Sequence, residues 1–268
     1  MAKKVRELTI AEKMAKVMDL RPIDDVFFEV LAKEPGVLQE MLRTILEDDR
    51  LTVDPDTIIV QSSERNLYGR SVRLDALCTL GDGTLCNIEV QRSDNDDHFR
   101  RVRFNASSIT VKTSQTGEDF RDINNVCIVY LSEFDFIGEG KTIYHIDKTI
   151  RETGTVVDDG LTEVFVNASV VDRTKISDLM SCLVRKEAND DQFPALIGAV
   201  RHLKHDETGV TAVCEVMKKY EDIAKSEGRA EAIFKLFKDG LLNLEVAAKQ
   251  LEMSAEEFQR AYDEYRER

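Results

Sequence analysis

Asp75, Glu89 and Gln91 are the residues of this sequence whose types and spacing best suit chemistry. Hard divalent cations such as Mg²⁺ prefer oxygen ligands, and Mg²⁺ keeps several waters when a protein binds it. We expect Asp75 and Glu89 to hold one Mg²⁺ (or Mn²⁺) ion that activates a water toward a phosphoryl group, with Gln91 orienting that water. From the spacing alone, the favoured interpretation is an exposed sheet face with ordinary polar residues, because this spacing is a loose pattern.

Two strands must position these residues. The segment 72–91 alternates between apolar and polar residues on both sides of a Gly-Asp-Gly sequence, which predicts a β-hairpin. A three-residue loop pairs residues whose numbers sum to 164, so Asp75 lies directly across from Glu89, with Cβ atoms about 5 Å apart. Gln91 shares their face. The opposite face is then almost wholly apolar, so burial supports the same register.

The size and composition indicate a protein with a real core. Its 268 residues, 42% of them hydrophobic, allow one large domain or one domain with an appendage. No apolar run predicts a transmembrane helix, and the start of the chain lacks an apolar signal region. We therefore expect a cytoplasmic protein with no membrane partner. The five scattered cysteines indicate reduced core thiols rather than a zinc site.

The net charge of −14 counts against a tight, non-specific DNA binder, because most nucleic-acid binders carry a basic face. It does not exclude a nuclease, since acidic metal ligands can coexist with a local basic strip. Arg100, Arg101 and Arg103 are candidates for phosphate contacts in such a strip. They could equally form a solvated helix face or pair with the aspartates of 94–97.

The order of predicted elements indicates an α/β core at 1–171, followed by a helical region at 172–268 that ends in a helix-turn-helix-like pair. The continuous apolar run 124–131 predicts a central strand. The segment 142–169 is rich in strands and either extends the sheet or forms a β-flap. Because the last helix is acidic, we expect the terminal pair to serve packing or protein contacts, with a homo-oligomer as one option. The other predicted elements are helices at 8–20, from 24 onward, at 37–46 and at 95–113, and a strand at 57–62.

Asp24 and His98 each have two interpretations. Asp24 begins an N-terminal helix, where it is either a helix cap or a third acid that points at the metal. Taken alone, the cap is favoured, and Asp25 is an equally short step away. His98 is either a base or proton shuttle, or a surface histidine, and we favour the surface position.

Several short motifs, taken in order and spacing, resemble those of the PD-(D/E)XK nuclease family transposases, also called the recombination-promoting nuclease or putative transposase family. The resemblance spans roughly residues 20–265. The matching motifs are Asp24-Asp25-Val26-Phe27, Arg73-Leu74-Asp75, Asn87-Ile88-Glu89-Val90-Gln91, His98-Phe99, Arg103-Phe104 and, in the helical tail, 227–231, 240–248 and 253–257.

This resemblance implies a restriction-endonuclease-like mixed sheet flanked by helices. It also implies Mg²⁺-dependent DNA cleavage associated with recombination and mobile elements. By position, it makes Asp75 and Glu89 metal ligands and puts Gln91 in the place of the superfamily's lysine. It makes Asp24 the acid on the first helix.

The sequence therefore predicts a metal-dependent DNA endonuclease whose partner is DNA. The main alternative is a catalytically inactive nuclease-fold protein that acts through its helical tail as a binding or regulatory module, as the acidic charge suggests. Cleavage of RNA instead of DNA is a third reading that the residues leave open.

Overall fold

The computed structural model describes residues 8–64, 72–95 and 97–266, and it divides into two compact units, 1–213 and 214–268. The elements of the first unit are α1 (Ile10–Met18), α2 (Asp25–Leu31), α3 (Val37–Ile45), β1 (Val53–Glu64), β2 (Val72–Leu80), β3 (Leu85–Gln91), α4 (His98–Thr113), the 3-10 helix η1 (Phe120–Asp122), β4 (Val126–Ser132), β5 (Ile143–Ile146), β6 (Lys148–Thr149), β7 (Val156–Val157), β8 (Leu161–Asn167), α5 (Lys175–Val184) and α6 (Pro194–His205). Helix α7 (Glu207–Lys238) crosses the division, and α8 (Leu244–Gln250) and α9 (Ala255–Arg266) follow it.

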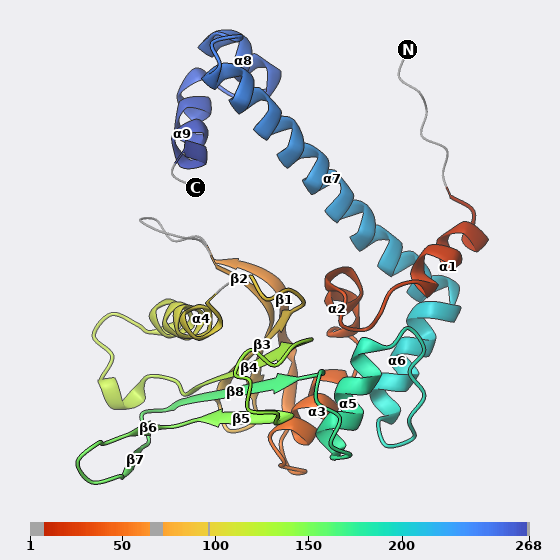
Figure 1. Ribbon diagram of the computed structural model, residues 1–268, viewed down its shortest axis with the longest axis vertical. Helices are drawn as coiled ribbons and strands as arrows, with labels where there is room; N and C mark the ends of the chain where they lie inside the picture. Colours follow the sequence, from red (N-terminus) through yellow and green to blue (C-terminus); the bar gives the residue numbers. More distant parts are fainter. Residues whose placement is uncertain (1–7, 65–71, 96, 267–268) are drawn as a thin grey trace. The chain divides into compact units, whose positions relative to one another are not determined.

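A six-stranded mixed sheet with the order β1-β2-β3-β4-β8-β5 forms the centre of the first unit (Figure 1). The strands β3, β4 and β8 run parallel, and the outer pairs are antiparallel. Strand β4 is buried along its whole length, as its apolar sequence predicts. Strands β5 and β8 extend the sheet, while β6 and β7 form a separate two-stranded ribbon. The predicted α/β class is therefore confirmed.

The β2–β3 hairpin has the predicted register. Ala76 pairs with Ile88 and Cys78 with Cys86, so the residue numbers of each pair sum to 164. The Leu80 N–H donates to the Thr84 carbonyl at 2.8 Å and closes the three-residue loop. Gly83, the last loop residue, has a φ of +88°, a left-handed conformation that favours glycine over residues with a Cβ.

Helix α4 connects β3 to β4 and packs against the sheet (Figure 1). It begins at His98, three residues later than predicted, because the Asp97 side chain caps it by accepting from the Arg100 N–H. Val102, Ala106 and Ile109 are buried against β4, as their spacing predicts. The other first-unit helices lie away from α4 and pack on one another, with α3 against α5 and α6.

The second unit has its own small core. Phe234, Phe258 and Tyr262 are buried together with two alanines of α8. A capping box opens α9, since Ser254 and Glu257 exchange hydrogen bonds between side chains and backbone. Within the described part of the chain, no helix is long and apolar enough to cross a membrane.

Lys204 of α6 fastens the N-terminal segment to the first unit. The residue is 3% exposed, and its ammonium donates to the carbonyls of Leu20 at 2.7 Å, Met18 at 3.3 Å and Lys186. The same group lies 5.6 Å from the ring centroid of Phe27. One buried cation thus satisfies carbonyls at the end of α1 and holds the turn that leads into α2.

Replacing Lys204 with Met should lower the free energy of unfolding by on the order of 2–4 kcal/mol, because it leaves buried carbonyls without a donor. Urea unfolding measures this loss. The matched control is Lys186→Met, which removes an exposed ion pair with Asp19 and should change the stability by less than about 1 kcal/mol. Equal effects of the two substitutions would contradict this anchoring role.

Candidate functional site

The Asp75 carboxylate lies where β1, β2 and β3 meet. Its Oδ2 accepts from the Val90 backbone N–H at 2.8 Å, and its Oδ1 accepts from Gln61 Nε2 at 3.3 Å. Gln61 of β1 has a left-handed φ of +53°, rare for a residue with a side chain in a strand. The two strands that flank β2 therefore both hold this carboxylate in place.

Glu89 is buried under α4, with 1% of its surface exposed. Asn87 donates to its Oε1 at 2.8 Å, and Arg101 Nε lies 3.8 Å from its Oε2. Burial, followed by the charge of Asp75, raises the pKa of Glu89 to about 8, while Asn87 and Arg101 act in the opposite direction. Burial and the charge of Asp75 therefore both favour the protonated form of this carboxyl group.

Two buried acceptor oxygens near this point, Glu89 Oε2 and Asn87 Oδ1, have no hydrogen-bond partner among the described residues. The amide nitrogen of Asn105, on the α4 turn after Arg101, is in the same condition. Buried polar atoms are nearly always paired, so an unpaired group needs an explanation such as an unbound ion or water. The two oxygens can therefore accept from a cation or a water, and the Asn105 nitrogen can donate to a water or another acceptor.

A cavity of about 480 Å³ opens beside the strip between α4 and β3. Asp75, Gln91 and Arg101 line it together with Asp25 of α2. The Gln91 side chain is fixed because its amide donates to the Ser93 carbonyl at 2.6 Å. The structure thus brings the predicted residues Asp75, Glu89 and Gln91 into one region, which Arg101 completes.

The two acids at the start of α2 have different surroundings. Asp24 holds the N-cap position without a capping hydrogen bond, and its carboxylate instead accepts from Arg21 at 2.7, 2.9 and 3.2 Å. Arg92 lies 3.3 Å from it, and both arginines also pair with Glu133. Asp25, one residue on, is exposed and lines the cavity. The ion-pair cluster of Asp24 therefore borders the cavity through Arg92, whereas Asp25 lines the cavity directly.

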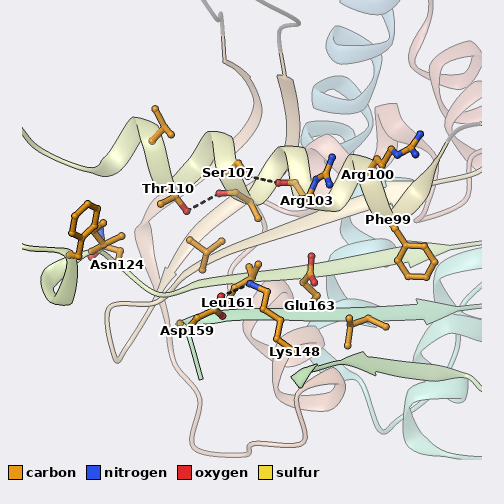
Figure 2. A pocket seen from close by; sticks show the side chains of 17 residues that line it. Phe99, Arg100, Arg103, Ser107, Thr110, Asn124, Lys148, Asp159, Leu161 and Glu163 are labelled. Atoms are coloured by element: carbon orange, nitrogen blue, oxygen red, sulfur yellow. Dashed lines mark hydrogen bonds and ion pairs between the residues drawn. The ribbon is translucent and has the colours of Figure 1, made fainter. Parts of the chain in front are cut away.

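The three candidate arginines of α4 do not share a face. Arg101 reaches Glu89, whereas Arg100 and Arg103 line a second cavity on the other flank of the helix (Figure 2). Arg100 also pairs with Asp97 at 3.3 Å, one of the pairings expected from the sequence.

The expected surface position of His98 is wrong, because this residue is only 4% exposed. Its Nε2 lies 2.9 Å from Asp94 Oδ1 and its Nδ1 lies 2.7 Å from the Tyr130 hydroxyl. A carboxylate only accepts, so Nε2 carries a hydrogen and donates it to Asp94. These two contacts link the start of α4 to β4, the strand that neighbours β3 and its residue Glu89.

Sequence reasoning missed two residues of the site, Gln61 and Arg92. Gln61 lies 14 positions before Asp75, in a strand whose polar residues gave no periodic signal. Arg92 directly follows the predicted Gln91, so its adjacency to the motif was a usable signal. Among the described residues, no group of three or more His, Cys, Asp or Glu side chains is arranged to hold a metal.

Comparison with known proteins assigns the first unit to one family. No curated protein and no solved structure matches the chain significantly. The family model of the PD-(D/E)XK nuclease family transposases matches residues 22–209, a range that starts just before α2 and ends near the division between the two units. It covers more than half of the chain and contains both acids of the hairpin, so this chain belongs to the PD-(D/E)XK nuclease family transposases.

Proposed function

We propose that this protein is a Mg²⁺-dependent DNA endonuclease whose active site is the cavity at Asp75. The observation that carries the proposal is the buried Glu89 carboxyl group with an unpartnered oxygen, next to a second carboxylate at a solvent-open cavity. Membership of a nuclease family supports the same reaction class. Mn²⁺ should replace Mg²⁺, because both ions prefer oxygen ligands.

The residues present fit a hard cation. Mg²⁺ is usually bound through one or two carboxylates, with waters and substrate phosphates as the other ligands, so a site with two protein carboxylates is sufficient. Asp75 and Glu89 would hold the ion. The chemistry that Mg²⁺ supplies when bound is a lowered pKa of water and stabilisation of charge on a phosphoryl oxygen.

The side chains of the protein would prepare the substrate and the water. Arg101 lines the cavity beside Glu89 and is placed to contact a phosphate oxygen. Gln91 would orient the attacking water, since an amide can hold a water but cannot deprotonate it. Hydrolysis then forms a bond from the water oxygen to phosphorus and breaks one ester P–O bond, and the departing oxygen takes up a proton.

Of the two acids at the start of α2, the geometry favours Asp25 as the third acidic group. The Asp24 carboxylate, assigned to the metal by family resemblance, is occupied by Arg21 and Arg92. Asp25 lines the same cavity as Asp75. We therefore transfer the proposed role to Asp25, where it would act on the ion through a bound water.

Purified protein with Mg²⁺ should nick supercoiled plasmid DNA, and Asp75→Asn or Glu89→Gln should slow nicking by roughly 10²–10³-fold, the effect of losing about 3–4 kcal/mol of transition-state stabilisation. Gel analysis of the plasmid over time measures the rates, and EDTA should stop the reaction. The matched control is Asp82→Asn, the same change at the exposed turn of the hairpin. Undiminished nicking by both site variants would refute the assignment.

The metal-free protein should lose stability as the pH rises from about 5 to 8. The folded state holds the Glu89 proton up to a pKa of about 8, whereas the unfolded chain releases it near 4.5, so the unfolding free energy falls across this window. Glu89→Gln removes the effect. Its melting temperature relative to wild type should therefore increase with pH, by an amount equivalent to roughly 3–4 kcal/mol between pH 5 and pH 8.

Thermal unfolding in EDTA at pH 5 and pH 8 measures this difference. Adding Mg²⁺ at pH 8 should stabilise the wild-type protein and not the variant, because the ion supplies the positive charge that the Glu89 proton supplies at low pH. If the difference in melting temperature between Glu89→Gln and wild type does not change with pH, Glu89 ionises like a solvated glutamate.

Asp24→Asn should mainly lower the stability, whereas Asp25→Asn should mainly slow DNA nicking. Asp24→Asn weakens a half-buried ion-pair cluster and should cost about 1–3 kcal/mol of stability. Asp25→Asn should leave stability within about 1 kcal/mol of wild type but slow plasmid nicking roughly tenfold. Urea unfolding and nicking rates, measured on both variants, separate the two roles. Normal nicking by Asp25→Asn would exclude it from the site.

A further inference from the structure

A second cavity of about 790 Å³ lies between α4 and the side of the sheet formed by β8 and β5 (Figure 2). It shares no lining residue with the cavity at Asp75. All of its walls belong to the first unit. The proposed cleavage chemistry makes no use of it.

The walls of the second cavity are apolar and partly aromatic. Phe99 of α4 is 49% exposed there, and Phe120 of η1 is 89% exposed. Further apolar surface comes from Val111, Ile123, Ile146 and Leu161. Large apolar side chains that stay exposed around one concave surface are typical of a binding site. Aromatic walls suit a flat ring in particular.

Two carboxylates and one ammonium line this cavity, and the ammonium is already paired with one of the carboxylates. Glu163 of β8 is half-buried and points into the space below α4 (Figure 2). Lys148 of β6 lines the same wall, pairs with Asp159, and acts on Glu163 through its charge. Burial raises the pKa of Glu163, because the wall shields its carboxylate from water. The cavity thus presents a two-oxygen acceptor beside an ammonium donor.

Arg100 and Arg103 of α4 also line the cavity, at its rim: Figure 2 shows their side chains extending from the helix away from Glu163 and Lys148, and Arg100 pairs with Asp97. Arginine side chains bind phosphate through paired N–H donors. The cavity therefore combines exposed aromatic rings, a carboxylate acceptor with an ammonium donor, and arginines at its rim, all of which complement parts of a nucleotide.

We propose that this second cavity binds a guanine nucleotide. The Watson–Crick edge of guanine presents one acceptor, O6, next to two parallel donors, N1–H and the N2 amino group. A carboxylate accepts from the two donors together, and an ammonium donates to O6, so Glu163 and Lys148 match the order of groups on this edge. The phosphate would lie against Arg100 and Arg103, and Phe99 would contact the base.

The other bases fit this wall less well. Cytosine and adenine each present a single amino donor next to ring acceptors, and those acceptors would face the Glu163 carboxylate. Thymine has one N–H between two carbonyl oxygens, and these oxygens would also face the Glu163 carboxylate. The site should therefore discriminate by charge and hydrogen bonding, and not by size alone.

The test is calorimetric titration of the full chain with dGMP, dIMP and dCMP in metal-free buffer. We expect dGMP to bind roughly tenfold or more tighter than dCMP, and several-fold tighter than dIMP, which lacks the N2 amino group. Equal affinity for dGMP and dCMP, or no binding of dGMP at millimolar concentration, would overturn the proposal. Because metal and cleavage play no part, this result is independent of the nuclease assay.

Glu163→Gln should weaken dGMP binding roughly tenfold and remove the preference over dIMP, because an amide puts an N–H against a guanine N–H. Arg103→Gln should weaken all three nucleotides by a similar factor, since phosphate contacts carry no base identity. The controls are Glu139→Gln, an exposed glutamate outside the cavity, and a thermal melt of each variant. A Glu163→Gln protein that melts normally and still prefers dGMP to dIMP would also overturn the proposal.

A final comparison identifies the source of the nucleotide. Twelve-residue oligothymidine with one central guanine is titrated beside oligothymidine alone and dGMP. Tighter binding of the guanine-containing strand than of dGMP assigns the cavity to an unpaired base of a DNA strand. A preference for dGMP over both strands assigns it to a free nucleotide. Identical binding of the two strands, together with no binding of dGMP, would again refute the proposal.

Discussion

The rest of the site depends on keeping the Glu89 carboxyl group out of water beside a second acid. An unpaired buried carboxylate costs several kcal/mol, so the fold must either neutralise it or supply partners. Asn87, Arg101 and a bound proton do this in part, and one oxygen stays without a hydrogen bond. The apolar side of the hairpin, which includes Cys86 and Ile88, maintains the arrangement, because a slip of one residue would expose that side to solvent.

Helix α4 separates two kinds of chemistry by its own geometry. Successive residues of an α-helix are rotated by about 100°, so Arg101 and Arg103 point in nearly opposite directions. Residues four apart share a face, which puts Asn105 with Arg101 over β3 and Ser107 with Arg103 at the second cavity. A cluster of arginines in sequence is therefore not a basic strip in space. Neither cavity needs a basic protein, which is how a chain with a net charge of −14 can still present local cationic groups.

The sequence predicted what alternation and periodicity control, namely the hairpin register, the buried β4 and the inner face of α4. It could not choose between Asp24 and Asp25, because one step around a helix changes the direction of a side chain by about 100°. The burial of His98 depends on Tyr130, which is 32 residues away, and no local pattern contains that contact. Gln61 reaches Asp75 from a residue with left-handed φ, a departure from the regular strand that alternation assumes.

The helices that follow the sheet are part of the nuclease-family unit for a physical reason. The sequence groups α5 and α6 with the helical region at 172–268, whereas in the structure they pack with the first unit. The Ile23 N–H donates to the Leu183 carbonyl of α5, and Lys204 of α6 holds the Leu20 carbonyl. These bonds fix the turn immediately before α2, whose first residue, Asp25, lines the cavity at Asp75. A unit cut at 171 would leave that turn without its partners, which is why the matched family region must extend through α6.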